Sequence, residues 1–170
     1  KFTPQPNTPF EAVWYASMEF ADVDGDGDED LLIIGEKFGS TFAQLYLNDG
    51  EGNFTPQPNT PFFGLSTSSF AFADLNGNGA LDVIVTGFDE SDILYATLFV
   101  NNGEGNFTID ESTPFEGLYD GTVIFADVDN DGDMDVVITG GDLDWNPHTH
   151  LYINDGEGNF EESSFVFDNF

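Results

Sequence analysis

The sequence predicts an all-β protein made of propeller blades, with three four-stranded antiparallel sheets in one chain of 170 residues. Three observations lead to this prediction. A phrase rich in aspartate and glycine occurs three times, beginning at Ala21, Ala73 and Ala126. A second phrase, typical of a tight hairpin, follows each copy at a nearly constant distance. Short apolar runs of strand length fill the space between the two phrases.

The repeated phrases define one repeat domain over residues 1–170. The repeats cover 2–53, 54–106 and 107–159, and a tail, 160–170, is expected to complete the last outer strand. Periods near 50 residues are typical of propellers and other arrays, in which each unit buries an apolar face against its neighbour. A β-solenoid and a β-sandwich fit less well, because solenoid periods are usually shorter and sandwiches do not repeat so faithfully.

The strands are clearest in the third copy, where "TVIFAD", "DVVITG" and "HLYIND" are β-branched or aromatic runs and "NFEESSF" supplies a fourth. No helix is predicted. "NDGEGN", between the third and fourth runs, has the Asn, Asp and Gly content of a tight hairpin. The second runs, "LLII", "VIV" and "VVI", are almost continuously apolar, which favours sheets covered on both faces. Four such strands in one repeat match the size of a propeller blade.

The composition excludes several classes of partner. The chain has 33 acidic residues, two lysines and no arginine, so its formal charge of −31 repels nucleic acid and anionic membrane surfaces. Hydrophobic residues make up 39%, and 19 phenylalanines recur at fixed places in the repeats, which indicates a packed core rather than disorder. Cysteine is absent, and no apolar stretch approaches the length of a membrane span, so no membrane insertion is expected.

The acidic phrase has the donor pattern of a calcium loop. In "DVDGDGDED" the side chains at loop positions 1, 3, 5 and 9 can converge on one cation, Gly27 permits a sharp turn, and the carbonyl at position 7 adds a further oxygen. The first half resembles an EF-hand loop, but Ile33 stands where the EF-hand has its acidic position 12. The predicted ligands are Asp22, Asp24, Asp26, Asp28 and Asp30; Asp74, Asn76, Asn78, Ala80 and Asp82; and Asp127, Asp129, Asp131, Asp133 and Asp135.

We therefore expect three Ca²⁺ ions per chain as structural cofactors. The alternative is that these segments are ordinary Asp/Gly-rich turns. Three copies in register favour the metal, because unneutralised carboxylates so close together repel one another. The second loop has two fewer carboxylates and is expected to bind most weakly.

The sequence resembles FG-GAP and VCBS-type repeats, the calcium-binding blades of integrin α-subunit β-propellers and of many secreted bacterial proteins. "FFGLSTSSFAFADLNGNGALDVIVTG", from Phe62, carries the Phe-Gly, the acidic loop and the following strand. The Gly-Ala-Pro half of the motif survives only as Gly35, Gly87 and Gly140, which favours the bacterial-type branch. The resemblance implies that the first strand of each blade lies innermost, near the ring axis. It also implies an extracellular or cell-surface location; the chain shows no signal sequence and is interpreted as a processed or excised segment.

Three blades leave two sheet faces open, whereas propellers are closed rings of typically four to eight blades. We expect two chains to close a six-bladed ring, because closed symmetry is the common solution for homo-oligomers. In that ring the opening "KFTPQPNTPF" and the closing "NFEESSF" could both supply outer-strand material at the seam. A fragment of a longer propeller and an open array are the alternatives.

Ligand binding is expected where the copies diverge, on the face opposite the acidic loops. An aromatic and acidic surface there suits sugar rings or a peptide, although any single aromatic residue could instead wedge between blades. Its candidate residues are Trp14, Tyr15, Phe38, Phe88, Tyr119, Asp120, Asp142, Asp144 and Trp145. His148 and His150 form an H-x-H pair, interpreted as one packing residue and one polar surface residue, because no third metal ligand is evident.

The predicted function is therefore a calcium-binding propeller module for extracellular adhesion or for carbohydrate or protein recognition. A self-assembling repeat scaffold without a ligand of its own is the alternative. No enzymatic activity is expected, because metal-bound carboxylates are poor general acids and no nucleophile constellation stands out. A polysaccharide-acting enzyme is the least favoured hypothesis, with Glu36 and Asp144 as its candidate carboxylates.

Overall fold

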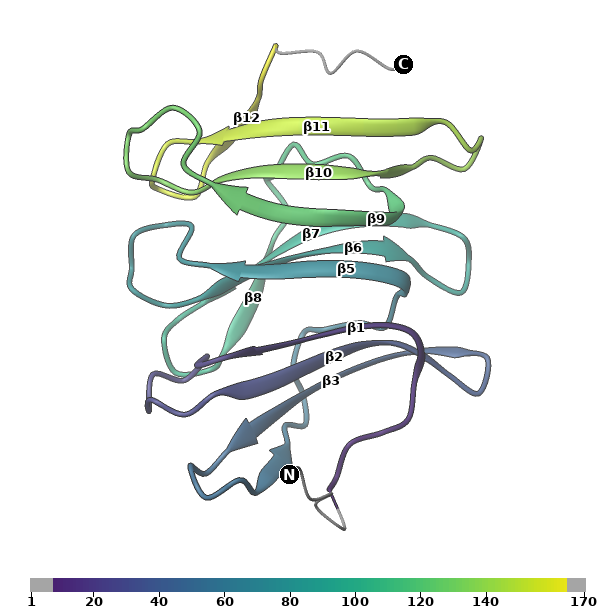
Figure 1. The fold of residues 1–170 in the computed structure, drawn as a ribbon, viewed down its shortest axis with the longest axis vertical. Helices are drawn as coiled ribbons and strands as arrows, with labels where there is room; N and C mark the ends of the chain where they lie inside the picture. The colour runs from purple at the N-terminus through teal and green to yellow at the C-terminus, as the bar shows by residue number, and fades with distance from the viewer. Residues whose placement is uncertain (1–7, 165–170) are drawn as a thin grey trace, which may run out of the picture.

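The computed structural model describes residues 8–164, and within them the chain forms three four-stranded antiparallel sheets and no helix (Figure 1). The first sheet contains β1 (Trp14–Ala21), β2 (Asp30–Lys37), β3 (Ser40–Asn48) and β4 (Phe54–Pro56). The second contains β5 (Ser66–Ala73), β6 (Asp82–Phe88), β7 (Leu94–Asn101) and β8 (Phe107–Asp110). The third contains β9 (Tyr119–Ala126), β10 (Asp135–Gly141), β11 (Pro147–Asn154) and β12 (Phe160–Glu162). The predicted all-β blade fold is confirmed.

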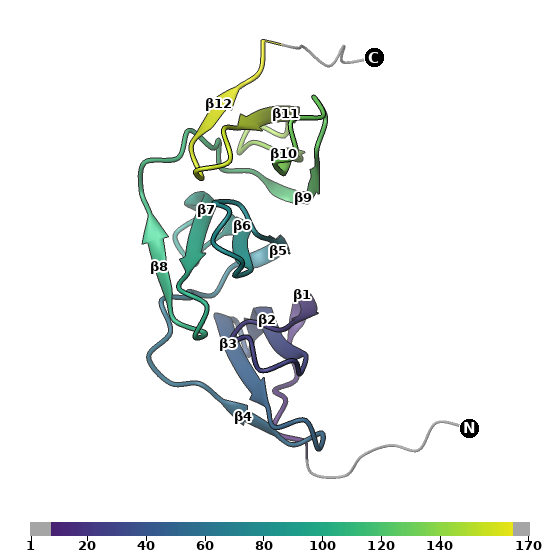
Figure 2. The same cartoon turned by 90° about the vertical axis from the view of Figure 1, so that its left-hand side faces the viewer.

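Neighbouring strands in each sheet are also neighbours in the chain, as in a propeller blade. The three sheets stack face to face, with β1, β5 and β9 along one edge and the short β4, β8 and β12 along the opposite edge (Figure 2). The first strand of each sheet is thus the inner one, as the family resemblance implies.

The boundaries of the sequence repeats do not coincide with the boundaries of the sheets. Residues 2–53, 54–106 and 107–159 each end just before a fourth strand, so every sheet takes its last strand from the beginning of the next range. The tail supplies β12 through its first residues, and 165–170 lie outside the described residues. The same holds for residues 1–7, so the prediction that the opening segment adds outer-strand material falls mostly outside the described part of the chain.

The second strand of the first two sheets is buried on both faces, as its continuous apolar run predicts. Leu32 and Ile34 of β2 pack in one cluster with Val83 and Val85 of β6, which forms the core between the first and second sheets. A second core joins the second and third sheets, and includes Ile84, Leu98, Leu118, Val136 and Tyr152. The outer face of the first sheet is covered by Phe10 and Val13 from the segment before β1. Within residues 8–164, no helix is present that could cross a membrane.

Each inner strand begins with a bulge. The residues Tyr15, Thr67 and Asp120 have positive φ angles of 47°, 44° and 53°, and the pairing with the second strand shifts register at the same point. β-Bulges bend a strand and re-aim the side chains beside them. Tyr119, the residue before the bulge in the third sheet, is the first residue of β9 and therefore lies at the end of the strands opposite the acidic loops.

Candidate functional site

The first acidic loop joins β1 to β2 and is wrapped by its own carboxylates. Asp22 accepts hydrogen bonds from the main-chain N–H groups of Gly25, at 2.9 Å, and Gly27, at 3.0 Å. Both glycines have positive φ, which lets the chain turn this tightly. One carboxylate oxygen from each of Asp22, Asp24 and Asp30 lies within 4.8 Å of the other two. Loop positions 1, 3 and 9 are therefore brought together.

The third loop repeats this cluster with Asp127, Asp129 and Asp135, whose oxygens also lie within 4.8 Å of one another. Asp127 accepts from the N–H of Gly132 at 3.2 Å through Oδ2. Its Oδ1 is shut off from solvent and has no hydrogen-bond partner among the described residues. A buried carboxylate oxygen without a hydrogen-bond partner is suited to ligate a cation.

The second loop differs in charge. It holds carboxylates at Asp74 and Asp82, and amides replace them at Asn76 and Asn78. The Asn78 amide is committed to the scaffold, because it donates to the carbonyl of Asn101 at 3.0 Å while its oxygen accepts from the N–H of Ala80 at 2.7 Å. This loop therefore offers fewer free oxygens to a cation than the other two.

The side chains at positions 5 and 7 lie outside the clusters of three carboxylates. Asp26 accepts from the N–H of Asp28 at 2.9 Å, so its side chain serves the turn. The carboxylate of Asp28 lies directly against Gly50 of the β3–β4 hairpin, and Asp133 lies against Gly156 in the same way. A Cβ at either glycine would overlap the carboxylate, which explains glycine at these two hairpin positions.

The aspartate at position 9 is buried in every blade, with Asp30, Asp82 and Asp135 no more than 1% exposed. Asp30 accepts from the N–H of Val23 at 3.0 Å and from the N–H of Asn48 at 2.8 Å, so it fixes the loop to the third strand. Burial raises the pKa of Asp82 to about 6 and that of Asp30 in the same direction. The oxygen-only donor set of the first and third loops fits a hard divalent cation such as calcium.

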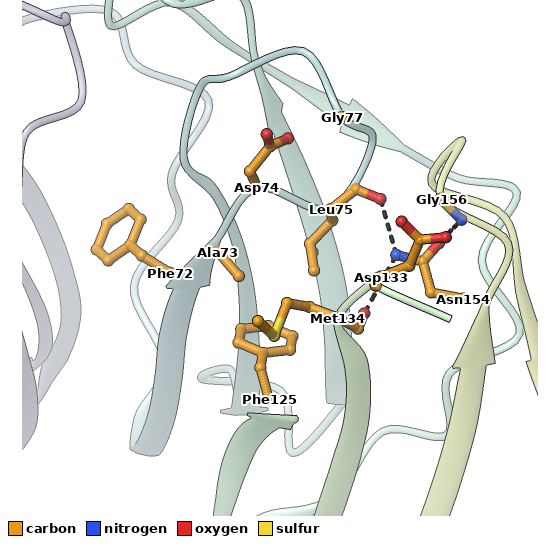
Figure 3. Close-up of a pocket in the computed structure, with 11 residues that line it drawn as sticks. Phe72, Ala73, Asp74, Leu75, Gly77, Phe125, Asp133, Met134, Asn154 and Gly156 are labelled. Atoms are coloured by element: carbon orange, nitrogen blue, oxygen red, sulfur yellow. Dashed lines mark hydrogen bonds between the residues drawn. The ribbon is translucent and has the colours of Figure 1, made fainter. Parts of the chain in front are cut away.

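The asparagines at the ends of β7 and β11 tie neighbouring sheets together, whereas the side chain of Asn48, at the end of β3, donates to Glu29 in its own blade. Asn101 donates through its side-chain amide to the carbonyl oxygen of Val23 at 2.8 Å, and Asn154 donates to that of Leu75 at 2.8 Å. Figure 3 shows the second of these bonds beside a cavity of about 450 Å³, which Phe72 and Phe125 also line. Sequence reasoning missed this role, although the asparagine recurs in all three copies.

At the strand ends opposite the acidic loops, an aromatic pocket lies between the second and third sheets. Phe88 and Tyr119 meet edge to face with ring centroids 5.6 Å apart, and Tyr119 meets Trp145 in the same way at 5.9 Å. Asp92 and Leu143 complete a pocket of about 200 Å³. Trp145 is 81% exposed, so its ring presents an open aromatic surface.

A second pocket of about 310 Å³, less apolar than the first, shares Tyr119 and Trp145 with it. It is lined by Asp120, Thr139, Pro147 and three glycines, Gly121, Gly140 and Gly141. The two rings therefore lie between two depressions, of which the second carries more polar groups. This combination of apolar area and a few polar groups is typical of small-ligand sites.

The Trp145 hairpin is fixed by Asp142. The Asp142 carboxylate accepts from the N–H groups of Asp144 and Asn146, each at 2.9 Å, and the main chain of Trp145 donates back to the Asp142 carbonyl at 2.9 Å. Hydrogen bonds from Asn146 and His148 hold the pKa of Asp142 well below its usual range. A rigid hairpin holds the indole in place at little entropic cost to a ligand.

The predicted ligand residues separate into two groups. Phe88, Tyr119, Asp120 and Trp145 line the two pockets, whereas Asp144 is exposed on the hairpin beside them. Trp14, Tyr15 and Phe38 lie on the first sheet, 74%, 65% and 99% exposed, and line neither pocket. Asp92 and Leu143 were missed, because only the stacking of two sheets shows that they meet Trp145.

The interpretation of the histidine pair was wrong in one respect. His150 was expected at a polar surface position, yet its side chain is only 15% exposed, while that of His148 is 31% exposed. The segment before β9 covers His150, with Glu116 3.1 Å from its Nε2.

Fold and loops together define a repeat protein of the β-propeller class, with an acidic loop after the first strand of each blade. A model of the FG-GAP-like repeat matches residues 22–85 and 81–138, which together make up more than half of the chain. The chain belongs to the FG-GAP-like repeat family. A search among curated proteins gives no match.

Among solved structures, the chain is similar to a lectin from Agrocybe aegerita that specifically recognises non-reducing terminal N-acetylglucosamine. The identity is 25% and the TM-score 0.60. The match covers 86% of this chain and 37% of the lectin chain, so this chain spans well under half the length of that protein.

Proposed function

We propose that this protein is a calcium-stabilised propeller module that recognises carbohydrate through the pocket around Tyr119 and Trp145. The observation that carries this proposal is the open indole of Trp145, held by a rigid hairpin beside carboxylate and main-chain groups. The bacterial-type VCBS assignment, the extracellular location and a role in adhesion belong to the same proposal, since millimolar calcium and surface glycans are found outside the cell.

Sugar chemistry fits this geometry. One face of a pyranose ring carries C–H groups and packs on an aromatic ring, while its hydroxyls need hydrogen-bond acceptors and donors. The Trp145 indole offers the first, and the Asp120 carboxylate and the main chain of the glycines that line the pocket offer the second. The similarity to a lectin that recognises terminal N-acetylglucosamine supports the class of ligand.

Three carboxylates of the first loop and three of the third would hold calcium, and Asp74 and Asp82 with two amides would do so in the second. The cation would neutralise clustered charge and lock each loop against the hairpin beside it. We assign it a structural role, because the acidic loops and the aromatic pocket lie at opposite ends of the strands (Figure 1).

The test is a glycan array that includes terminal N-acetylglucosamine, probed with wild type, Trp145→Ala and Trp14→Ala. Trp14 is the matched control, 74% exposed but outside the pocket. We expect selective binding that weakens at least tenfold in Trp145→Ala and is unchanged in Trp14→Ala. Failure of the wild type to bind any glycan would overturn carbohydrate recognition, and equal binding by both variants would overturn the site.

A second candidate function is self-assembly, with two copies of the chain closing a six-bladed ring. Unequal exposure of equivalent residues favours it. Val23 and Leu75 are 2% and 1% exposed beneath the following sheet, but the equivalent Val128 is 45% exposed. On the open face of the first sheet, Met18 is 61% exposed, whereas its equivalent in the second sheet, Phe70, is 7% exposed. The two uncovered faces thus expose residues whose equivalents are buried between sheets inside the chain.

The contact between the two copies would resemble the contact between sheets within one chain, with one difference. Gly64 and Gly117 pack against the main chain of the preceding sheet, and the equivalent residue of the first sheet is Ala12. The formal charge of −31 on each copy also opposes association, so bound calcium and salt would favour the ring.

Light scattering in millimolar calcium tests the assembly. We expect a mass twice 18.6 kDa for the wild type, a monomer for Ile124→Glu and tighter association for Ala12→Gly. Ile124 is 53% exposed on the open face of the third sheet; Leu143→Glu, on an exposed hairpin residue, is the control and should leave the mass unchanged. A monomeric wild type would overturn the ring, and a dimeric Ile124→Glu would place the interface elsewhere. Both results are independent of glycan binding.

We propose binding rather than catalysis. Glu36 lies on β2 of the first sheet and Asp144 on the β10–β11 hairpin of the third, so the two candidate carboxylates belong to different blades. Polysaccharide hydrolysis that is lost in Glu36→Gln or Asp144→Asn would contradict this proposal.

A further inference from the structure

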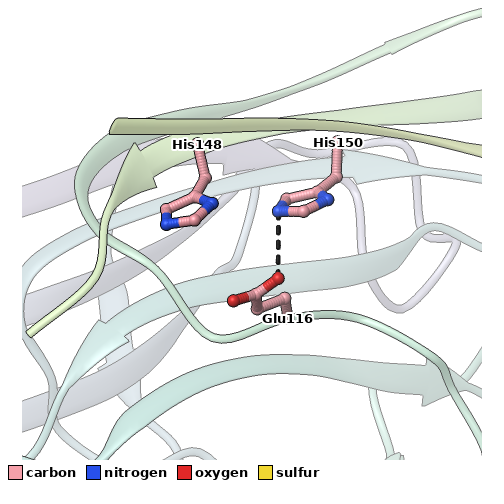
Figure 4. A group of neighbouring side chains, drawn as sticks. All are labelled: Glu116, His148 and His150. Carbon is pink, nitrogen blue, oxygen red and sulfur yellow. Dashed lines mark ion pairs between the residues drawn. The ribbon is translucent and has the colours of Figure 1, made fainter. Parts of the chain in front are cut away.

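The third sheet carries a cluster of metal-ligating side chains that is separate from the acidic loops. His148 and His150 are alternate residues of β11, so their side chains share one face of the sheet. Glu116 approaches that face from the segment before β9 (Figure 4). One ring nitrogen of each histidine and one oxygen of Glu116 all lie within 4.8 Å of one another.

The histidine rings are held in place by further carboxylates. His148 contacts Asp142 through Nε2 at 2.9 Å, and His150 contacts Glu162 through Nδ1 at 2.7 Å. The two rings stack with centroids 5.8 Å apart and an angle of 9° between their planes. Carboxylates on the outer nitrogens of metal-ligating histidines orient the rings and raise their basicity.

The inner nitrogen of His150 lacks a well-formed hydrogen bond. Nε2 is buried and has no hydrogen-bond partner among the described residues, although a Glu116 oxygen lies 3.1 Å away. The contact is short, but its alignment is not that of a hydrogen bond. A buried nitrogen that faces a carboxylate in this way is a ready ligand for a cation between the two.

The cluster is specific to the third sheet. The first sheet has Phe42, Gln44 and Glu11 at the three equivalent positions, and the second has Tyr95, Thr97 and Phe63. Both other sheets fold without the histidines, so the blade does not require them. Their presence in one copy calls for a role other than scaffold packing.

We propose that the third sheet binds a divalent transition-metal ion, with zinc as the best match, through His148, His150 and Glu116. Imidazole nitrogens favour zinc over calcium, which takes oxygen ligands. Zinc bonds of about 2.0–2.1 Å place tetrahedral ligand atoms about 3.3 Å apart, so atoms now within 4.8 Å reach the metal with small side-chain rotations. The negative charge of the whole chain draws cations to the site.

The site would sit beside the ligand pocket. Asp142, which contacts His148, also fixes the Trp145 hairpin. A metal bound at the histidines would therefore fix His148 on β11 and, through Asp142, the Trp145 hairpin.

The experiment is a calorimetric zinc titration in excess calcium, which keeps the acidic loops filled. Wild type is compared with His148→Tyr/His150→Thr, which carries the residues of the second sheet at these positions, and with Glu116→Gln. Gln44→Thr, the equivalent change in the first sheet, is the matched control. We expect one zinc ion per wild-type chain, at least tenfold weaker binding in both site variants, and no change in the control.

A spectroscopic readout separates ligation from loose association. Cobalt in place of zinc should give the visible absorption of a four-coordinate site in the wild type and lose it in the double histidine variant. Circular dichroism without metal verifies that the variant is folded. No stoichiometric zinc binding by the wild type, or equal binding by wild type and the folded histidine variant, would overturn the proposal.

Discussion

The side-chain amide of Asn101 donates a 2.8 Å hydrogen bond to the carbonyl oxygen of Val23, 78 residues earlier in the chain. Asn101 is fully buried, and the same carbonyl also accepts from the N–H of Gly105. The hairpin of one sheet is thereby fastened to the acidic loop of the sheet before it. Asn154 and Leu75 form the same link at the next junction. This contact couples any cation in a loop to the packing between blades.

Replacing this amide should loosen the first junction. We expect Asn101→Ala to lower the free energy of unfolding by about 1–3 kcal/mol, because two side-chain hydrogen bonds are lost, one to the carbonyl of Val23 and one to that of Leu81. Asn48→Ala is the matched control, because the side-chain amide of Asn48 donates only to the carbonyl of Glu29 in its own blade, at 3.1 Å. Urea unfolding measures both variants. Equal losses would show that the bond between the sheets contributes nothing of its own.

A close backbone approach at the same junction gives a second prediction. A Cβ on Gly64 would overlap the main chain of Thr41 and Phe42 in β3. We expect Gly64→Ala to cost about 1–3 kcal/mol through overpacking. Ala12→Gly, at the equivalent position of the first sheet, should cost about 1 kcal/mol or less through added chain entropy. Thermal and urea unfolding would check the difference, and a neutral Gly64→Ala would disprove the close packing.

Calcium dependence can be tested by making the first loop resemble the second. In Asp24→Asn the loop loses one carboxylate, as at Asn76. At about 1 mM calcium, a site with a Kd near 10⁻⁴ M adds about 1.4 kcal/mol of stability, and the variant should lose most of it. In EGTA it should be at least as stable as wild type, because burial and the nearby Asp26 and Asp22 raise the pKa of Asp24.

The measurement is urea unfolding of both proteins in calcium and in EGTA, with Asp144→Asn as the exposed control. An equal loss of unfolding free energy in both buffers would show that calcium does not stabilise the first loop.

The β6–β7 hairpin predicts a pH effect. Hydrogen bonds from the N–H groups of Ile93 and Ser91, and from the Tyr95 hydroxyl, lower the pKa of Asp89. A depressed folded-state pKa contributes stability above the unfolded value near 4, and this contribution is lost as the pH falls through the folded pKa. Asp89→Asn should therefore melt below wild type at pH 7, and the gap should narrow as the pH falls below about 4 and through the depressed folded-state pKa of Asp89. A gap that does not change with pH would exclude the charge as its cause.

The sequence predicted the blades well because their signals are local. Alternating apolar runs, glycine-rich turns and the acidic phrase each lie within a dozen residues, and three copies reinforce one another. The boundaries were less certain: a period fixes the length of a unit, but it does not say where a unit begins. Each fourth strand therefore falls in the following repeat.

The sites depended on contacts between sheets. The sequence suggested Trp14, Tyr15 and Phe38 together with Phe88, Tyr119 and Trp145, and the structure brings only the last three into one pocket. No local signal distinguishes these two groups, because membership depends on which sheet stacks on which.

By itself, the sequence determined an all-β repeat fold with three acidic loops of like design, because backbone geometry and turn chemistry are set by near neighbours. Only the tertiary structure decided which distant side chains meet. The stacking of one sheet on the next brings Asn101 to Val23 and Tyr119 to Phe88, and the segment leading into β9 carries Glu116 to His150. These contacts depend on the offset and twist between sheets, which no short stretch of the chain encodes.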